Sequence, residues 1–267
     1  MKTLAGAAAL LAVVCAPTLA RANPKPLPYS YPFMTLPKGS VEVELYGDLT
    51  PLRALSTTTG DEATYARTQF QIEVEIGLLD YLELGLYVKA TPPAGEGYQQ
   101  TANQENGGQL KQRLRARFAD PGEWPVDLSV YFEVVEALDE VELEAKLNLA
   151  RRFERLHLMA NLSGEVEFYF DGHRDYVLNP SAGFAYEAMA ALQPGFEYWT
   201  RVEFADIEGQ ELSIQQAHYA GPTLLLQFDK IWWSTGFYFR LDNIGGERIP
   251  GESFGRVWAR TIVGAGF

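Results

Sequence analysis

The sequence has a single cysteine, Cys15, among 267 residues, and it lies in an N-terminal apolar run. The preceding residue, Val14, is larger than the small residue that a lipoprotein signal has at this position. Once the N-terminal run is removed, the chain has no thiol, which excludes disulfides, thiol nucleophiles and cysteine-ligated zinc. Phosphate loops, dinucleotide fingerprints and metal-ligand spacings are also missing, so we expect no cofactor and no metal.

Long apolar runs are absent after residue 22. No later stretch reaches the about 20 apolar residues that a membrane-spanning helix needs. A chain of this composition can therefore cross a membrane only as a closed barrel. Basic residues are also scarce, with 22 Lys and Arg against 35 Asp and Glu. This acidic balance argues against nucleic acid as a partner.

Residues 1–22 have the features of a secretory signal peptide. Lys2 precedes a short apolar run that ends at Pro17, and the small residues Ala20 and Ala22 have the spacing that signal peptidase requires. The run is too short to anchor the chain in a membrane. We expect cleavage after Ala22 and export to the cell envelope.

Residues 23–39 are rich in proline, which cannot donate to a strand ladder. Five prolines and three aromatic residues occur between Pro24 and Pro37. Two placements of this segment are open. It is either an ordered periplasmic lead-in, which we favour, or a segment tucked into the barrel.

Residues 40–267 follow a period of two. In the first such segment Val41 and Val43 alternate with Glu42 and Glu44, which puts the apolar side chains on one face of a strand. Alternating segments of about ten residues are typical of outer-membrane barrels, whose even strand number returns both chain ends to the periplasm. The twelve predicted strands lie near Ser40, Thr68, Leu82, Gln109, Val126, Val141, Leu156, Val177, Phe196, Gln216, Ile231 and Gly255.

Long and short connections alternate between these segments. The sequence therefore predicts an all-β protein, a transmembrane antiparallel up-and-down β-barrel with short periplasmic turns and longer extracellular loops. We expect it in the bacterial outer membrane, in contact with lipid. A monomer is favoured, although the sequence does not fix the oligomeric state.

One strand indicates which face points inward. Four bases from Lys111 to Arg117 share a face, opposite Leu114 and Phe118. Exposing a base to lipid costs ~2–4 kcal/mol near the midplane, so we expect all four to face the lumen. The residues predicted to line the lumen and set its selectivity are Lys111, Arg113, Arg115, Arg117, Glu73, Glu75, Glu133, Glu142, Glu144, Arg201, Arg240 and Arg260.

The end of the chain has a further signal. Val263, Ala265 and the terminal Phe267 lie on one face of the last predicted strand. This pattern resembles the C-terminal signal by which bacterial outer-membrane proteins are passed to their insertion machinery. We therefore expect that machinery to be a partner.

Three pieces of the chain resemble a poorly characterised group of bacterial outer-membrane proteins. They are the Leu-Pro-Lys-Gly sequence at 36–39, the hairpin at 77–85 and the Pro-Gly-Phe-Glu-Tyr-Trp sequence at 194–199. The group includes the family of outer-membrane transporters assigned to the MetA pathway of phenol degradation. The resemblance implies a monomeric barrel with a transport role, and it supplies no catalytic residue.

The ionised interior leaves two interpretations open. In the first, the barrel is a channel or passive transporter for small polar, charged or aromatic solutes, selected by the field between its basic and acidic rows. In the second, the charges pair and seal the lumen, and the outer loops bind a ligand or partner.

A third possibility, an outer-membrane lipid hydrolase, is disfavoured. The candidate residues His157, Asn161, Ser163 and Glu165 alternate along one strand and face inward, away from the lipid. Residues 157 and 163 are about 20 Å apart along an extended strand, far beyond the reach of a nucleophile and its base. We therefore expect no enzyme activity.

Overall fold

The computed structural model describes residues 22–55, 59–60, 62–92, 107–206, 213–242 and 254–267. The predicted signal peptide lies outside the described residues apart from Ala22. None of the described residues belongs to a helix long and apolar enough to cross a membrane. The strands are β1 (Val41–Leu55), β2 (Glu62–Leu79), β3 (Leu82–Thr91), β4 (Gly107–Arg117), β5 (Asp127–Glu136), β6 (Glu140–Phe153), β7 (Leu156–Tyr169), β8 (Arg174–Leu178), β9 (Ser181–Tyr186), β10 (Leu192–Asp206), β11 (Ser213–Phe228), β12 (Ile231–Arg240) and β13 (Val257–Gly266).

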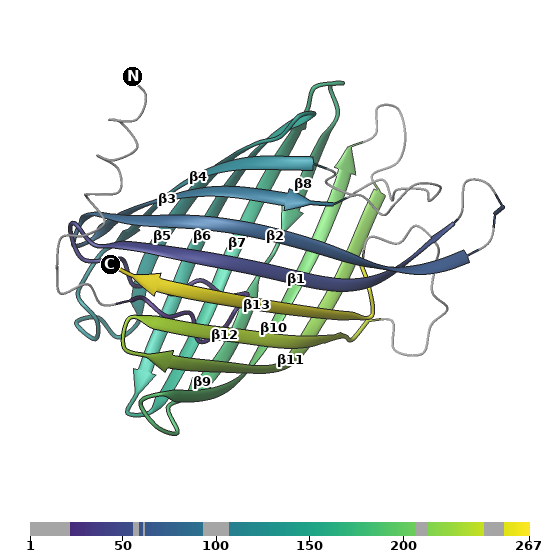
Figure 1. Ribbon diagram of the computed structural model, residues 1–267. Helices are drawn as coiled ribbons and strands as arrows, with labels where there is room; N and C mark the ends of the chain where they lie inside the picture. Colours follow the sequence, from purple (N-terminus) through teal and green to yellow (C-terminus); the bar gives the residue numbers. More distant parts are fainter. Residues whose placement is uncertain (1–21, 56–58, 61, 93–106, 207–212, 243–253) are drawn as a thin grey trace, which may run out of the picture.

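These strands form one closed antiparallel barrel (Figure 1). Strands that follow one another in the chain pair along most of the ring, and β1 also pairs with β13. The closing contact includes hydrogen bonds in both directions between Val41 and Phe267. The predicted antiparallel barrel is confirmed.

The eighth predicted strand, near Val177, is split into two. Both β8 and β9 lie between β7 and β10, where they occupy one position in the ring. The break falls at Asn179 and Pro180, because proline has no N–H for the ladder. The ring therefore has twelve strand positions and thirteen strands.

The barrel is apolar outside and polar inside. On β2, Ile72 is 53% exposed, whereas its neighbour Glu73 is completely buried. Leu114 on β4 is likewise exposed between the buried Arg113 and Arg115. Soluble proteins have apolar side chains inside and polar side chains outside. The reverse arrangement is expected for a barrel surrounded by lipid.

The two ends of the barrel have different connections. At one end, here called the turn end, β6–β7 and β11–β12 are joined by two residues each, and Glu154 and Asp229 begin these turns at a φ of 52°. The opposite end, the loop end, has long connections after β3 and β12 but only three residues between β5 and β6. The predicted alternation of long loops and short turns is therefore incomplete.

Residues 23–39, here called the plug, lie inside the barrel at the turn end. Lys25, Leu27, Ser30 and Leu36 are each at most 2% exposed, and the segment bonds to β1, β3, β7 and β10. Of the two placements, the structure has the tucked-in one, so the favoured periplasmic lead-in was wrong. The prolines keep the segment out of the ladder, but the N–H groups of Asn23, Tyr29, Ser30, Tyr31 and Leu36 find acceptors on the inner wall.

Candidate functional site

The plug divides the lumen into two cavities that share no lining residue. The cavity towards the loop end is here called the chamber, and Tyr29 and Tyr31 of the plug form part of its lining. The cavity at the turn end is lined by Pro24, Pro26 and Phe33 of the plug together with wall residues of the turn end. The plug therefore lies between these two cavities.

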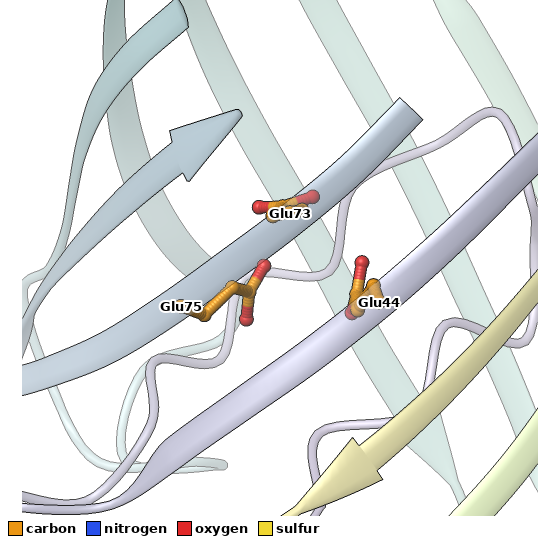
Figure 2. Close-up of side chains that lie close together, drawn as sticks. All are labelled: Glu44, Glu73 and Glu75. Carbon is orange, nitrogen blue, oxygen red and sulfur yellow. The ribbon is translucent and has the colours of Figure 1, made fainter. Parts of the chain in front are cut away.

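An ammonium group anchors the beginning of the plug. Lys25 Nζ forms an ion pair with Glu44 and lies 3.4 Å from Glu73 Oε2 and 3.2 Å from Glu75 Oε1. It also donates to Tyr46 Oη at 2.5 Å. Figure 2 shows that the three carboxylates come together from β1 and β2. A buried ammonium requires such partners, so Lys25 is bound firmly in this position.

Within the described part of the chain, the same three glutamates form a cluster of side chains of the kind that can bind a metal ion. Their ligand atoms lie within 4.8 Å of one another. Lys25 supplies the positive charge that a cation would otherwise provide. The cluster is therefore explained as an anchor for the plug, and we assign no metal to it.

Two arginines of β4 extend this network under the plug. Arg113 Nη2 lies 2.8 Å from Glu75 Oε1 and 2.6 Å from Glu83 Oε1, and Arg115 Nη2 lies 2.7 Å from the same Glu83 oxygen. Glu83 Oε2 in turn accepts the amide of Leu36 at 2.8 Å. All these charged side chains are completely buried, so the end of the plug is held by the same ion network as its beginning.

The middle of the plug is held through its backbone. The carboxylate of Glu197 on β10 accepts the amides of Tyr29 and Ser30, at 3.2 and 2.6 Å, and the hydroxyl of Tyr238. Asn161 on β7 accepts the Tyr31 amide at 2.7 Å and donates to the Tyr31 carbonyl at 3.0 Å. These bonds fix the backbone at the turn of the plug.

Aromatic rings close the floor of the chamber on one side. Tyr29 of the plug stacks on Trp199 with ring centroids 4.0 Å apart, and Trp199 stacks on Tyr219 at 4.2 Å. Trp258 meets Trp199 edge-on at 5.2 Å. Stacked rings bury large areas in fixed orientations, so this side of the plug is packed tightly.

The chamber has walls of opposite charge. Its lining contains nine acidic and six basic side chains. The bases Arg67, Lys89 and Lys111 come from the adjacent strands β2, β3 and β4, and most of the acids come from β5, β6, β7 and β10. A solute in the chamber therefore meets a transverse field and a net negative lining.

Acidic side chains directly oppose one another on the acidic wall. Glu144 is the register partner of both Glu133 and Glu165, and Glu142 is the partner of Glu167. Like charges directly opposite are destabilising. Arg201 reduces this repulsion through contacts with Glu165 at 2.5 Å and Glu167 at 2.9 Å.

The structure separates the predicted lumen residues into groups. Arg113, Arg115, Glu73 and Glu75 are buried against the plug and do not line the chamber. Arg117 lies at the turn end, where it pairs with Asp120, and Arg240 pairs with Asp242 outside the chamber lining. The predicted residues that do line the chamber are Lys111, Glu133, Glu142, Glu144, Arg201 and Arg260.

The predicted insertion signal lies on the outer surface. Val263 and Phe267 are 41% and 38% exposed, and Ala265 between them is partly exposed. The alternating pattern therefore points the apolar side chains of the last strand away from the lumen, as expected from the sequence.

The four residues considered for a hydrolase have other contacts. Asn161 binds the plug, Ser163 donates to the Asn179 carbonyl at 2.7 Å, and Glu165 pairs with Arg201. His157 lies at the turn end, 3.7 Å from Glu187. This strand does not bring a serine, a histidine and an acid together.

Sequence reasoning missed Lys25 and Arg67. Lys25 was overlooked because it lies among prolines outside the alternating pattern, although the excess of acids on the first strands indicates a missing base. Arg67 was overlooked because β2 begins at Glu62, several residues before the alternation becomes regular.

The closed ring, the apolar exterior and the ionised interior define an outer-membrane-type β-barrel. Solved structures that are similar in fold include a channel and a porin. The COG4313 outer membrane channel from Pseudomonas putida F1 is 12% identical, with 92% of this chain and 100% of that chain covered and a TM-score of 0.60. The NanC porin is 9% identical, with 84% of this chain and 98% of that chain covered and a TM-score of 0.55. No family model matches the sequence, and neither does any curated protein.

Proposed function

We propose that the protein is an outer-membrane channel for small charged or polar solutes, closed at its turn end by its own plug and weakly selective for cations. The observation that carries this proposal is the division of the lumen into a charged chamber and a plugged turn end. The fold shared with a channel and a porin supports a transport role.

The contacts of the plug favour a gate over a permanent core. Its wall contacts at Glu42, Glu83, Asn161 and Glu197 are hydrogen bonds to polar side chains. Water can replace such bonds when the segment moves, while the stack of Tyr29 on Trp199 and the burial of Leu27 against Met159 and Ala185 oppose the movement and favour the closed state. The plug is thus held firmly and can still be released.

The chamber lining supports the preference for cations. Nine acids against six bases give a formal charge of −3 when all are ionised. A lining with a net charge raises the local concentration of ions of the opposite sign. Its charges are screened less inside a narrow cavity than they would be in bulk water. We expect the preference to be weak because the six bases of the lining offset much of the acidic charge, and Lys111 already pairs with Glu133 at 3.2 Å.

Planar-bilayer recording tests this proposal directly. The processed protein, beginning at Asn23, should give rare openings, and in a salt gradient the reversal potential should indicate a preference for K⁺ over Cl⁻. The double substitution Glu144→Gln and Glu165→Gln should remove most of that preference. The matched control, Glu136→Gln on the exposed outer end of β5, should leave it unchanged.

The opposite outcome favours the runner-up, a sealed barrel with a binding role. The observation that favours it is the complete burial of the ion network under the plug. A correctly folded, heat-modifiable barrel that never conducts, even when voltage is applied, would contradict the channel. A chloride preference that survives the double substitution would contradict the assigned role of the chamber.

A further inference from the structure

Among the residues that the structure describes, Glu42 at the turn end has no charged partner of its own. The side chain of Glu42 on β1 is completely buried. Its Oε1 accepts the indole N–H of Trp232, and its Oε2 accepts the backbone N–H of Asn23 at 2.7 Å. Both donors are neutral in an uncleaved chain, so Glu42 has hydrogen bonds without a countercharge.

The surrounding network is short of positive charge. In the described part of the chain, five buried glutamates of β1, β2 and β3 face three buried bases, Lys25, Arg113 and Arg115. The five are Glu42, Glu44, Glu73, Glu75 and Glu83. A buried carboxylate without a cation is costly, and a further cation beside Glu42 would reduce the deficit.

We propose that Glu42 is a binding site for the α-ammonium group that signal-peptide cleavage between Ala22 and Asn23 creates, and that this ion pair locks the plug in the mature protein. The inference rests on the expected cleavage site, and it concerns the plug of the proposed channel. In the hydrolysis the Ala22–Asn23 amide bond breaks and water is consumed. Ala22 leaves as a carboxylate, and the Asn23 nitrogen becomes an amine that is protonated at neutral pH.

Asn23 already holds its backbone nitrogen next to the Glu42 carboxylate. The Asn23 side-chain amide donates to the Met34 carbonyl at 3.1 Å, which ties the first residue of the mature chain to the far end of the plug. Pro24 fixes the backbone that follows. The new terminus therefore needs no rearrangement to meet Glu42, and its charge converts a neutral hydrogen bond into the stronger charge-assisted kind.

Hydrogen exchange of the plug, combined with a double-mutant cycle, tests the lock independently of conductance. The protein is purified from outer membranes and its intact mass measured, which should place the N-terminus at Asn23. Four refolded forms are then compared in detergent: the processed protein, the same protein with its α-amine acetylated at mildly acidic pH while unfolded, Glu42→Gln, and acetylated Glu42→Gln. Glu136→Gln with and without acetylation is the matched control.

The lock predicts a specific pattern. Acetylation should speed exchange of the plug amides about tenfold in the processed protein and in Glu136→Gln. It should add little in Glu42→Gln, where the partner is already lost. Equal effects of acetylation with and without Glu42, or no effect in either, would overturn the lock, as would a mature terminus at another residue. Heat-modifiable migration of each variant shows that a change in exchange does not reflect failed folding.

Failure of the lock and failure of the channel remain distinguishable. A protein that conducts normally while acetylation has no effect on exchange contradicts only the Glu42 site. A protein that never conducts while the cycle shows coupling contradicts only the channel.

Discussion

The turn-end half and the loop-end half of the lumen have the same alternating strands but use their charges differently. At the turn end, Glu75 and Arg113 are completely buried and paired beneath the plug. At the loop end, Lys111 and Arg201 are 15% and 22% exposed and line a chamber. The comparison shows that inward charges are buried and paired where a chain segment covers them, and that they line a cavity where none does.

The energetics of the halves differ for the same reason. Removing one partner of a buried ion pair leaves an uncompensated charge and costs about 3–5 kcal/mol. A partly exposed pair contributes less, because water and salt screen it. Substitutions in the turn-end half should therefore affect stability and closure, and those in the chamber should affect selectivity.

The largest effect is expected at Arg113. Arg113→Met removes the cation shared by Glu73, Glu75 and Glu83 and should lower the free energy of unfolding by about 3–5 kcal/mol. Lys111→Met, two residues along the same strand, should cost about 1 kcal/mol or less. Urea unfolding in lipid vesicles measures both, and equal losses would remove the distinction between the halves.

A smaller effect is expected at Glu197. Glu197→Ala deletes the acceptor of the Tyr29 and Ser30 amides and should destabilise the closed plug by about 2–3 kcal/mol. Faster hydrogen exchange at these two amides and more frequent openings report the loss. Glu203→Ala, which removes an Arg201 partner on the same strand, is the control and should leave plug exchange unchanged.

The basic wall of the chamber should influence selectivity without affecting closure. Arg67→Gln removes one of the bases that oppose the acids and should raise the K⁺ to Cl⁻ permeability ratio by about a factor of two. Reversal potentials in a salt gradient measure the ratio. A changed frequency of openings instead would show that this wall also contacts the gate.

The smallest effect is expected outside both halves. Arg152 on the rim of the turn end pairs with Glu187 at 2.7 Å, and its side chain is 57% exposed. Arg152→Ala should change the free energy of unfolding by no more than about 0.5 kcal/mol. A loss as large as that at Arg113 would mean that burial does not determine the cost.

The period-two pattern was sufficient to predict the barrel, its antiparallel order and the inward direction of Arg113 and Arg115. Alternation is a local property, and burial of a base in lipid is costly enough to fix the facing. The pattern could not predict the split at Pro180. A proline is tolerated both at a break within a strand and at the end of a strand, so its position does not distinguish the two.

The plug could not be placed from the sequence. Its contacts join Lys25 to Glu73, and Tyr29 to Glu197, across 48 and 168 residues of chain. No periodicity relates such positions, and a proline-rich segment has no pattern of its own. The predicted lumen residues fall into a covered group and a chamber group for the same reason. The position of the plug determines which inward bases are covered, and the sequence does not show that position.

A reversible cross-link between plug and wall tests the central claim most directly. The Oγ atoms of Ser30 in the plug and Ser181 in β9 are 2.8 Å apart, close enough for a disulfide after Ser30→Cys and Ser181→Cys. The only natural cysteine, Cys15, lies in the predicted signal peptide. In planar bilayers the oxidised double variant should remain closed at every voltage, and reductant should restore openings, while each single variant conducts under both conditions. Openings of full amplitude from the cross-linked protein would contradict the account, because solutes would then pass without movement of the plug.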